Sequence, residues 1–186
     1  MNILQQIESR WFDSAASAIV SQVARFPGER FYAGAFWLCY VDYTLFGTPC
    51  FAMNTESHLA NCGAAVESST RWSPPNWQFD IIDETVEAMS PLYDTLSRSL
   101  AGQDSGVWDA TIEEHAQVLA RVSRRLTQHA RSRTGPFMQT HLLADFVVGI
   151  FDEREGQPTF SRLVRASIDP EILSTLPSPL WEAAGV

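Results

Sequence analysis

The stretch FYAGAFWLCYVDYTLFGTPCFAMN, residues 31–54, decides the fold class of this chain. Residues 31–43 are apolar on both faces and rich in aromatic side chains, and Gly34 interrupts them, which is typical of a central strand covered on both sides. A turn follows at residues 46–48, and residues 49–54 are again largely apolar. We therefore expect residues 31–43 and 49–54 to pair as a β-hairpin.

Helical patterns lie on both sides of this hairpin. Apolar residues recur at helical spacing over residues 2–26, and Pro27-Gly28 then ends the pattern. A helical segment is also expected at roughly 56–67, with Asn54 or Thr55 as its cap and Glu56 at the positive end of its dipole. Two longer helical patterns follow, from Asp83 to Leu100 and over residues 107–131.

Proline and glycine mark the remaining boundaries. Pro91 is expected to divide the helix that starts at Asp83 into two pieces, with Ser90 as the cap of the second piece. Residues 144–151 read as another buried strand, residues 159–166 and 170–176 as short helices, and the end of the chain as an irregular tail anchored by Trp181. These elements predict a single α+β domain over residues 1–186, with an antiparallel sheet of about three to five strands flanked by helices.

Composition restricts the classes of function. The chain has 186 residues, of which 45% are hydrophobic, so it can bury a sizeable core. It contains no apolar run long enough to span a membrane and no recognisable secretory signal, so we expect a soluble cytoplasmic protein without a membrane partner. The net charge is −9, and all 13 basic residues are Arg. This acidity argues against a nucleic-acid partner, because neutralising phosphates requires a basic surface.

The residues that most often bind metals or nucleotides are not arranged to do so. The histidines are His58, His115, His129 and His141, and none has a second ligand at a metal-binding spacing. His115 and His129 share a helix but are about 21 Å apart along it, at 1.5 Å per residue. There is no phosphate-binding loop or dinucleotide fingerprint either. We therefore expect neither a metal nor a cofactor.

Nucleophilic catalysis has two weak candidates. Gly102-Gln103-Asp104-Ser105-Gly106 has the wrong spacing for a nucleophile elbow and reads as a loop between helices. His58 and Cys62 lie four residues apart on one expected helix, so their side chains are able to meet. Cys39, Cys50 and Cys62 lack a metal-binding spacing and are expected to be buried and reduced. We expect no catalytic residue, with a small hydrolase or transferase that uses an unrecognised acid/base site as the alternative.

Acidic residues concentrate between Asn76 and Glu114, a segment with nine acids and one base, Arg98. This segment carries a net charge of −8, which is nearly the whole charge of the chain. One interpretation is a solvated helical face, and the other is a docking surface for a basic protein. For the second interpretation the candidate partner-binding acids are Asp80, Asp83, Glu84, Glu87, Asp104, Asp109, Glu113 and Glu114. Trp72, Trp77 and Trp108 are the candidate aromatic anchors.

Several of these segments resemble a known family. The aromatic strand that opens with Phe31-Tyr32, the second strand that closes on Asn54-Thr55-Glu56, the RWSPPNW loop at residues 71–77 and the strand that ends at Asp152 resemble the bacterial family known as domain of unknown function 4303. That family has no established activity, and some of its members are encoded among toxin–immunity genes. The resemblance implies a small cytoplasmic protein with a binding role, and it supplies no catalytic residues.

These observations favour a non-enzymatic protein-binding module as the function. The most concrete form is an immunity protein that binds and neutralises a cognate bacterial toxin through the acidic surface. A homo-oligomeric scaffold is a third hypothesis, beside the hydrolase or transferase.

Overall fold

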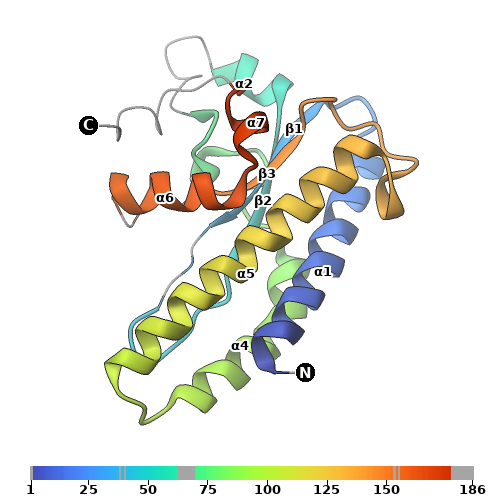
Figure 1. Cartoon of the computed structure of the whole chain (residues 1–186). Coiled ribbons are helices and arrows are strands. Elements are labelled where there is room, and N and C mark those ends of the chain that lie inside the picture. The colour runs from blue at the N-terminus through green and yellow to red at the C-terminus, as the bar shows by residue number, and fades with distance from the viewer. Residues whose placement is uncertain are drawn as a thin grey trace.

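The computed structural model describes residues 2–37, 39, 41–62, 70–152, 154 and 156–176. Figure 1 shows a small sheet with long helices on one side and short helices on the other. In chain order the helices and strands are α1 (Ile3–Arg25), β1 (Phe31–Trp37), β2 (Cys50–Thr55), α2 (Glu56–Cys62), α4 (Asp83–Leu100), α5 (Ser105–Ser132), β3 (Val147–Ile150), α6 (Gln157–Ser167) and α7 (Pro170–Leu173). Short 3₁₀ turns lie at Pro74–Asn76 and Gly135–Phe137.

The sheet has the strand order β2-β1-β3, so the expected hairpin partners lie at its centre and one edge. The antiparallel pairing of β1 with β2 is confirmed, with Gly34 opposite Met53 and Phe36 opposite Phe51. β3 pairs with β1 in parallel, which corrects the expectation of an antiparallel sheet. The physical reason is the long connection: α4 and α5 carry the chain back across the sheet, so β3 starts at the same end as β1. An apolar strand buried on both faces has the same composition in either direction.

Two hydrophobic cores cover the two faces of the sheet, and strand residues alternate between them. Phe36, Phe51 and Val148 point into the larger core, which α1, α4 and α5 complete. Trp37, Ala52 and other residues of the opposite face join a second core with the aromatic loop at residues 70–77 and with α6. Burial on both faces explains why each strand lacks the polar alternation of a half-exposed sheet.

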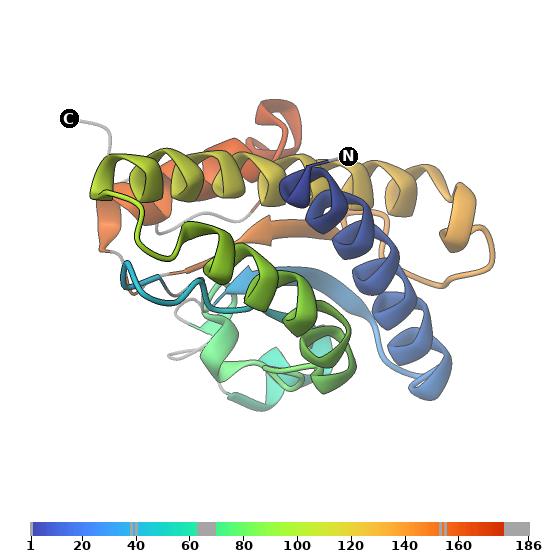
Figure 2. The ribbon, with the colours of Figure 1, turned by 90° about the horizontal axis from the view of Figure 1, so that it is seen from below.

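In the helical layer α1 packs against both α4 and α5. Figure 2 shows α1 and α4 side by side beneath the long α5. α4 is continuous through Pro91, which corrects the expectation of two pieces. Pro91 is exposed, and the buried residues on either side of it, Met89 and Tyr93, hold both halves of α4 in the core. Tertiary packing of an amphipathic face thus outweighs the backbone hydrogen bond that proline cannot make.

Several boundaries differ from those that the sequence predicts. β1 ends at Trp37 rather than at residue 43, because the chain then turns into a loop closed by the isolated bridge between Val41 and Phe46. α5 starts at Ser105, capped by Asp104, so the end of the expected inter-helix loop is already helical. α6 and α7 confirm the two short helices. Trp181 lies outside the described residues. Over the described part of the chain, no helix combines the length and the hydropathy of a membrane span.

Candidate functional site on helix α4

The acidic residues of α4 form one exposed row. Asp83, Glu84, Glu87 and Asp94 are all exposed, and their spacing places Asp83, Glu87 and Asp94 on one face, with Glu87 about one turn after Asp83 and Asp94 about two turns after Glu87. Asp80 continues the row before the helix begins, and its carbonyl oxygen accepts a hydrogen bond of 2.8 Å from the indole of Trp37. We call these five residues the α4 acidic row.

Within the residues that the structure describes, no member of the α4 acidic row forms an ion pair. The one basic residue of the helix, Arg98, donates to the carbonyl oxygen of Asp94 and to the hydroxyl of Thr95. The helix dipole accounts for acids in the first turn only, where Asp83 and Glu84 lie. Like charges at a spacing of four residues on a helix destabilise it, so the row costs the isolated chain free energy.

The negative field of the row reaches the neighbouring sheet edge. Burial, followed by the charge of Asp80, raises the pKa of the Cys50 thiol, and Asp83 raises it further against an opposing effect of Arg154. Asp80 and Asp83 thus act electrostatically on a residue of β2, as charges do at short range in a region of reduced dielectric constant.

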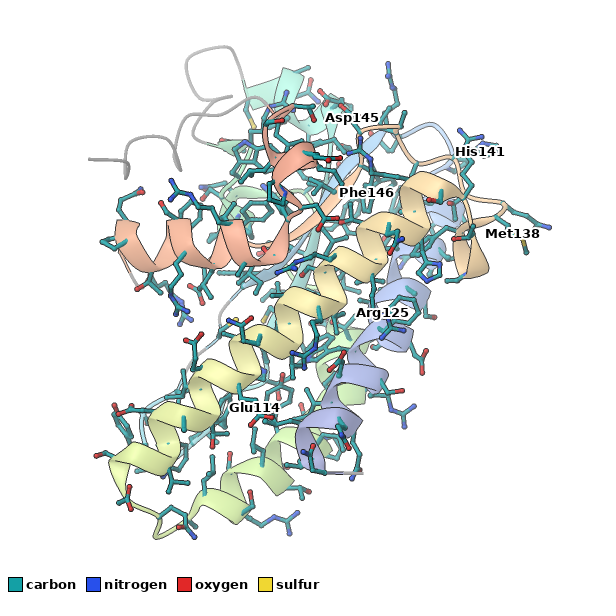
Figure 3. All side chains as sticks on the ribbon, viewed as in Figure 1. Glu114, Arg125, Met138, His141, Asp145 and Phe146 are labelled. Atoms are coloured by element: carbon teal, nitrogen blue, oxygen red, sulfur yellow. The ribbon has the colours of Figure 1, made fainter. Side chains whose placement is uncertain are left out.

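The acidic residues of α5, in contrast, mostly have local structural roles. Asp104 caps the helix by accepting from the backbone amide of Val107, and Asp109 accepts from the phenol of Tyr43 at 2.8 Å. Glu113 forms an ion pair with Arg162 at 2.8 Å. Glu114 is exposed; Figure 3 shows it on the half of α5 that precedes Arg125. Asp104, Asp109 and Glu113 thus have partners within the domain, so the acids of α5 are weaker candidates for partner binding than those of α4.

The structure removes the three tryptophans from the list of surface anchors. Trp72, Trp77 and Trp108 are exposed by only 1%, 4% and 2%, respectively. Trp72 and Trp77 pack on Phe151 under the sheet, and Trp108 packs on Phe46 beneath the helices. Large aromatic side chains contribute most when they are fully buried, and here the domain core takes that area instead of an interface.

A groove of about 380 Å³ between α1 and α4 adjoins the acidic row. Glu84 lines it from α4, and Asp13 and Gln22 line it from α1. Gln22 is only 6% exposed, and its carbonyl oxygen Oε1 is buried without a hydrogen-bond partner within the described residues. An unpaired buried acceptor is costly, and because this oxygen is closed to solvent, the cost falls on the packing of α1 and is not relieved from the open groove. This groove is not predictable from the sequence, because Gln22 reads as an ordinary helical residue.

Most residues that carry the family resemblance meet at one end of the hairpin, whereas Asp152 lies at the other end, where it accepts from the backbone amide of Cys39. Tyr32 donates to the carbonyl oxygen of Arg71 at 2.8 Å and accepts from the side chain of Asn54 at 3.0 Å. Arg71 forms an ion pair with Glu56 at 3.4 Å and lies over the Tyr32 ring. Thr55 bonds the side chain of Gln78 at 2.8 Å. This network satisfies buried polar groups and fixes the 71–77 loop on the sheet, which is a structural role.

The His58–Cys62 pair does come together, with Nε2 of His58 3.8 Å from the Cys62 sulfur. The same nitrogen lies 2.9 Å from the carbonyl oxygen of Asn76, a group that only accepts hydrogen bonds. Nε2 must therefore carry a proton, and it cannot at the same time take the proton of the thiol. The contact lacks the arrangement in which a histidine activates a cysteine nucleophile.

A buried node that the sequence does not predict lies where α1, α4 and α5 meet. Nε1 of Trp11 donates to the phenol oxygen of Tyr93 at 2.8 Å, and Tyr93 lies 2.5 Å from Nε2 of His115. Burial raises the pKa of Tyr93 and lowers that of His115 to about 3. Both side chains are thus neutral at physiological pH. Elsewhere in the described ranges, no cluster of three His, Cys, Asp or Glu side chains is placed to hold a metal ion.

Comparisons with protein-family models, with curated proteins and with solved structures found no match for this chain.

Proposed function

We propose that this chain is a protein-binding module without catalytic activity, and that the α4 acidic row is its binding surface. The most concrete form of the proposal is an immunity protein that binds a cognate bacterial toxin and neutralises it. The observation that carries the proposal is that the four acids of α4 are exposed and form no ion pair with a described residue.

The energetics of the row support a basic partner. Repulsion between neighbouring carboxylates on α4 destabilises the free protein, and a basic surface placed against them relieves it. Acids clustered on one helix also create a local potential that speeds encounter with a positively charged protein. Glu87 and Asp94 lie beyond the first turn of α4, where the helix dipole does not stabilise them. Neutralisation by a basic partner would explain why these charges are present.

The α1–α4 groove supports the same partner chemistry. Its wall holds two carboxylates, those of Asp13 and Glu84, and one guanidinium, that of Arg10. The carboxylates outnumber the cation, so an arginine or lysine side chain of a partner, which carries only donors, complements this wall. The proposal therefore places a basic side chain of the partner in the groove and further basic residues along the acidic row.

The family resemblance supports a toxin as the partner, because some members of that family are encoded beside toxin genes. The first test is co-purification of this chain with the product of the neighbouring gene at about 50 mM and about 500 mM salt. We expect binding at low salt that weakens strongly at high salt, since exposed charge pairs are screened within about 10 Å at 0.1 M ionic strength. Binding that is unchanged by salt would contradict the electrostatic mechanism.

A further inference from the structure

A cavity of about 350 Å³ lies on the other side of the helical layer, at the carboxyl end of the parallel strands. Cys39, two residues beyond β1, and Asp152, two residues beyond β3, lie in its wall. Beyond these ends the chain continues from β1 to β2 and from β3 to α6, so the two segments that follow the paired strands run apart. Small molecules bind preferentially at such points in sheets with parallel strands, and the volume is in the lower part of the range for ligand pockets.

The contacts of His115 show which of its two ring nitrogens carries the proton. An indole nitrogen only donates, so Trp11 donates to the oxygen of Tyr93. The Tyr93 hydroxyl then donates its own proton to Nε2 of His115, which is the other polar atom that the described residues place within reach. A neutral imidazole that accepts at Nε2 carries its proton on Nδ1. Burial keeps the ring neutral, because it lowers the pKa of His115 to about 3.

The Nδ1–H group of His115 is available to a ligand. The residue is 4% exposed, and it lines the cavity. Nδ1 has no hydrogen-bond partner within the described parts of the chain. The apolar side chains of Ile112, Leu119 and Ile150 also line the cavity. Tyr43 and Thr159 add hydroxyl groups to the wall. An oriented donor beside apolar side chains favours a ligand with one well-placed acceptor.

The charges around the cavity are matched within the protein. The carboxylate of Asp152 accepts from both the backbone and the guanidinium of Arg154 and from the amide of Cys39. Arg162 at the rim is paired with Glu113. Neither a cation nor an anion therefore finds an uncompensated charge there, and burying an unmatched ionic group in the cavity is unfavourable.

We propose that this cavity binds a small, uncharged, largely apolar molecule that carries a carbonyl oxygen, which accepts a hydrogen bond from Nδ1 of His115. This site is separate from the α4 acidic row, and it stands whether or not that row binds a protein. The ligand would lie among the side chains of α5 and α6, apart from the protein partner proposed for the acidic row.

The test uses acetophenone as the probe and ethylbenzene as a control of similar size without the carbonyl. The ¹⁵N shifts of the His115 ring in the wild-type protein should show a proton on Nδ1 and none on Nε2. Acetophenone should perturb the Nδ1 resonance and bind about five-fold more tightly than ethylbenzene, which is the gain expected for one neutral hydrogen bond. Ala116→Phe fills the cavity and should abolish binding of both compounds, whereas Ala110→Phe, on an exposed position of the same helix, should not.

Three results would overturn the proposal: a proton on Nε2 of His115, an Nδ1 resonance that acetophenone leaves unmoved, or equal affinity for the two compounds. These readouts come from the wild-type protein, so they decide the matter even if Ala116→Phe fails to fold.

Discussion

The phenol oxygen of Tyr93 lies 2.5 Å from Nε2 of His115, in a part of the core where both side chains are at least 96% buried. The same oxygen accepts from Trp11, so one hydrogen-bonded chain joins α1, α4 and α5. Specific polar contacts of this kind fix the relative positions of packed helices, because each group loses a partner if a helix shifts. Helix α4, which carries the acidic row, is held in place by this node.

Tyr93→Phe is expected to destabilise the fold. The change removes one oxygen and leaves both the Trp11 indole and Nε2 of His115 buried without a partner. An unsatisfied buried polar group costs about 1–3 kcal/mol, so the free energy of unfolding should fall by about 2–4 kcal/mol in urea denaturation. The control Tyr43→Phe removes the phenol oxygen of a residue that is 52% exposed. It should change the free energy of unfolding by less than about 0.5 kcal/mol. Equal effects of the two changes would contradict the node.

Acid should destabilise the protein through His115. The pKa of this residue is about 3 in the folded protein, against a reference value of 6.5, so the unfolded chain binds a proton more readily. Stability from the neutral ring is complete above pH 6.5 and is lost progressively as the pH falls toward 3. The loss between pH 7 and pH 4 should be about 3 kcal/mol. His115→Gln should remove this part of the pH dependence, whereas His141→Gln, at an exposed position, should retain it.

Gly149→Ala is expected to destabilise the sheet. An added Cβ would lie 2.9 Å from the ring of Phe151 and 3.1 Å from Ile168, both of which are buried. Overpacking of this kind costs about 1–3 kcal/mol, measured as a lower midpoint in thermal unfolding. Gly28→Ala is the matched control, since nothing lies within 4 Å of its added Cβ. If both variants unfold at the wild-type temperature, the close packing of β3 on Phe151 is wrong.

Pro91→Ala is expected to stabilise α4. Alanine restores the backbone donor that proline lacks in the helix interior, and the exposed position imposes no packing constraint. The gain should be about 1–2 kcal/mol, after allowance for the greater freedom of alanine in the unfolded chain. Pro75→Ala, in the loop, should instead lower the free energy of unfolding, because proline there restricts the unfolded chain without interrupting an α-helix. A loss of stability in Pro91→Ala would contradict the continuous helix.

Local patterns predicted most of the elements. The apolar runs of β1 and β2 and the turn between them specify the hairpin, and the helical periodicity of α1 and α5 specifies both helices. The direction of β3 could not be predicted, because it depends on the path of the chain between residues 55 and 147. The continuity of α4 through Pro91 could not be predicted either, since it depends on packing against α1.

The candidate site was predictable in part for the same reason. Charge is a property of the sequence, and the exposed acids of α4 were found by counting. Burial is a property of the fold. Trp108 lies on the apolar stripe of α5, which indicates the core, but the sequence offered no sign that Trp72 and Trp77 are buried or that Gln22 borders a groove. The position of the proton on the His115 ring depends on both Trp11 and Tyr93, which are 82 residues apart in the chain.

Binding of a basic protein by the α4 acidic row can be measured by isothermal titration calorimetry with the product of the neighbouring gene. The variant Asp83→Asn/Glu84→Gln/Glu87→Gln removes three charges from the row. The matched control, Asp145→Asn/Asp169→Asn/Glu171→Gln, removes the same charge from residues outside α4. We predict at least about ten-fold weaker binding for the first variant and nearly unchanged binding for the control. Equal affinities of the two variants would show that the α4 acidic row is not the binding surface.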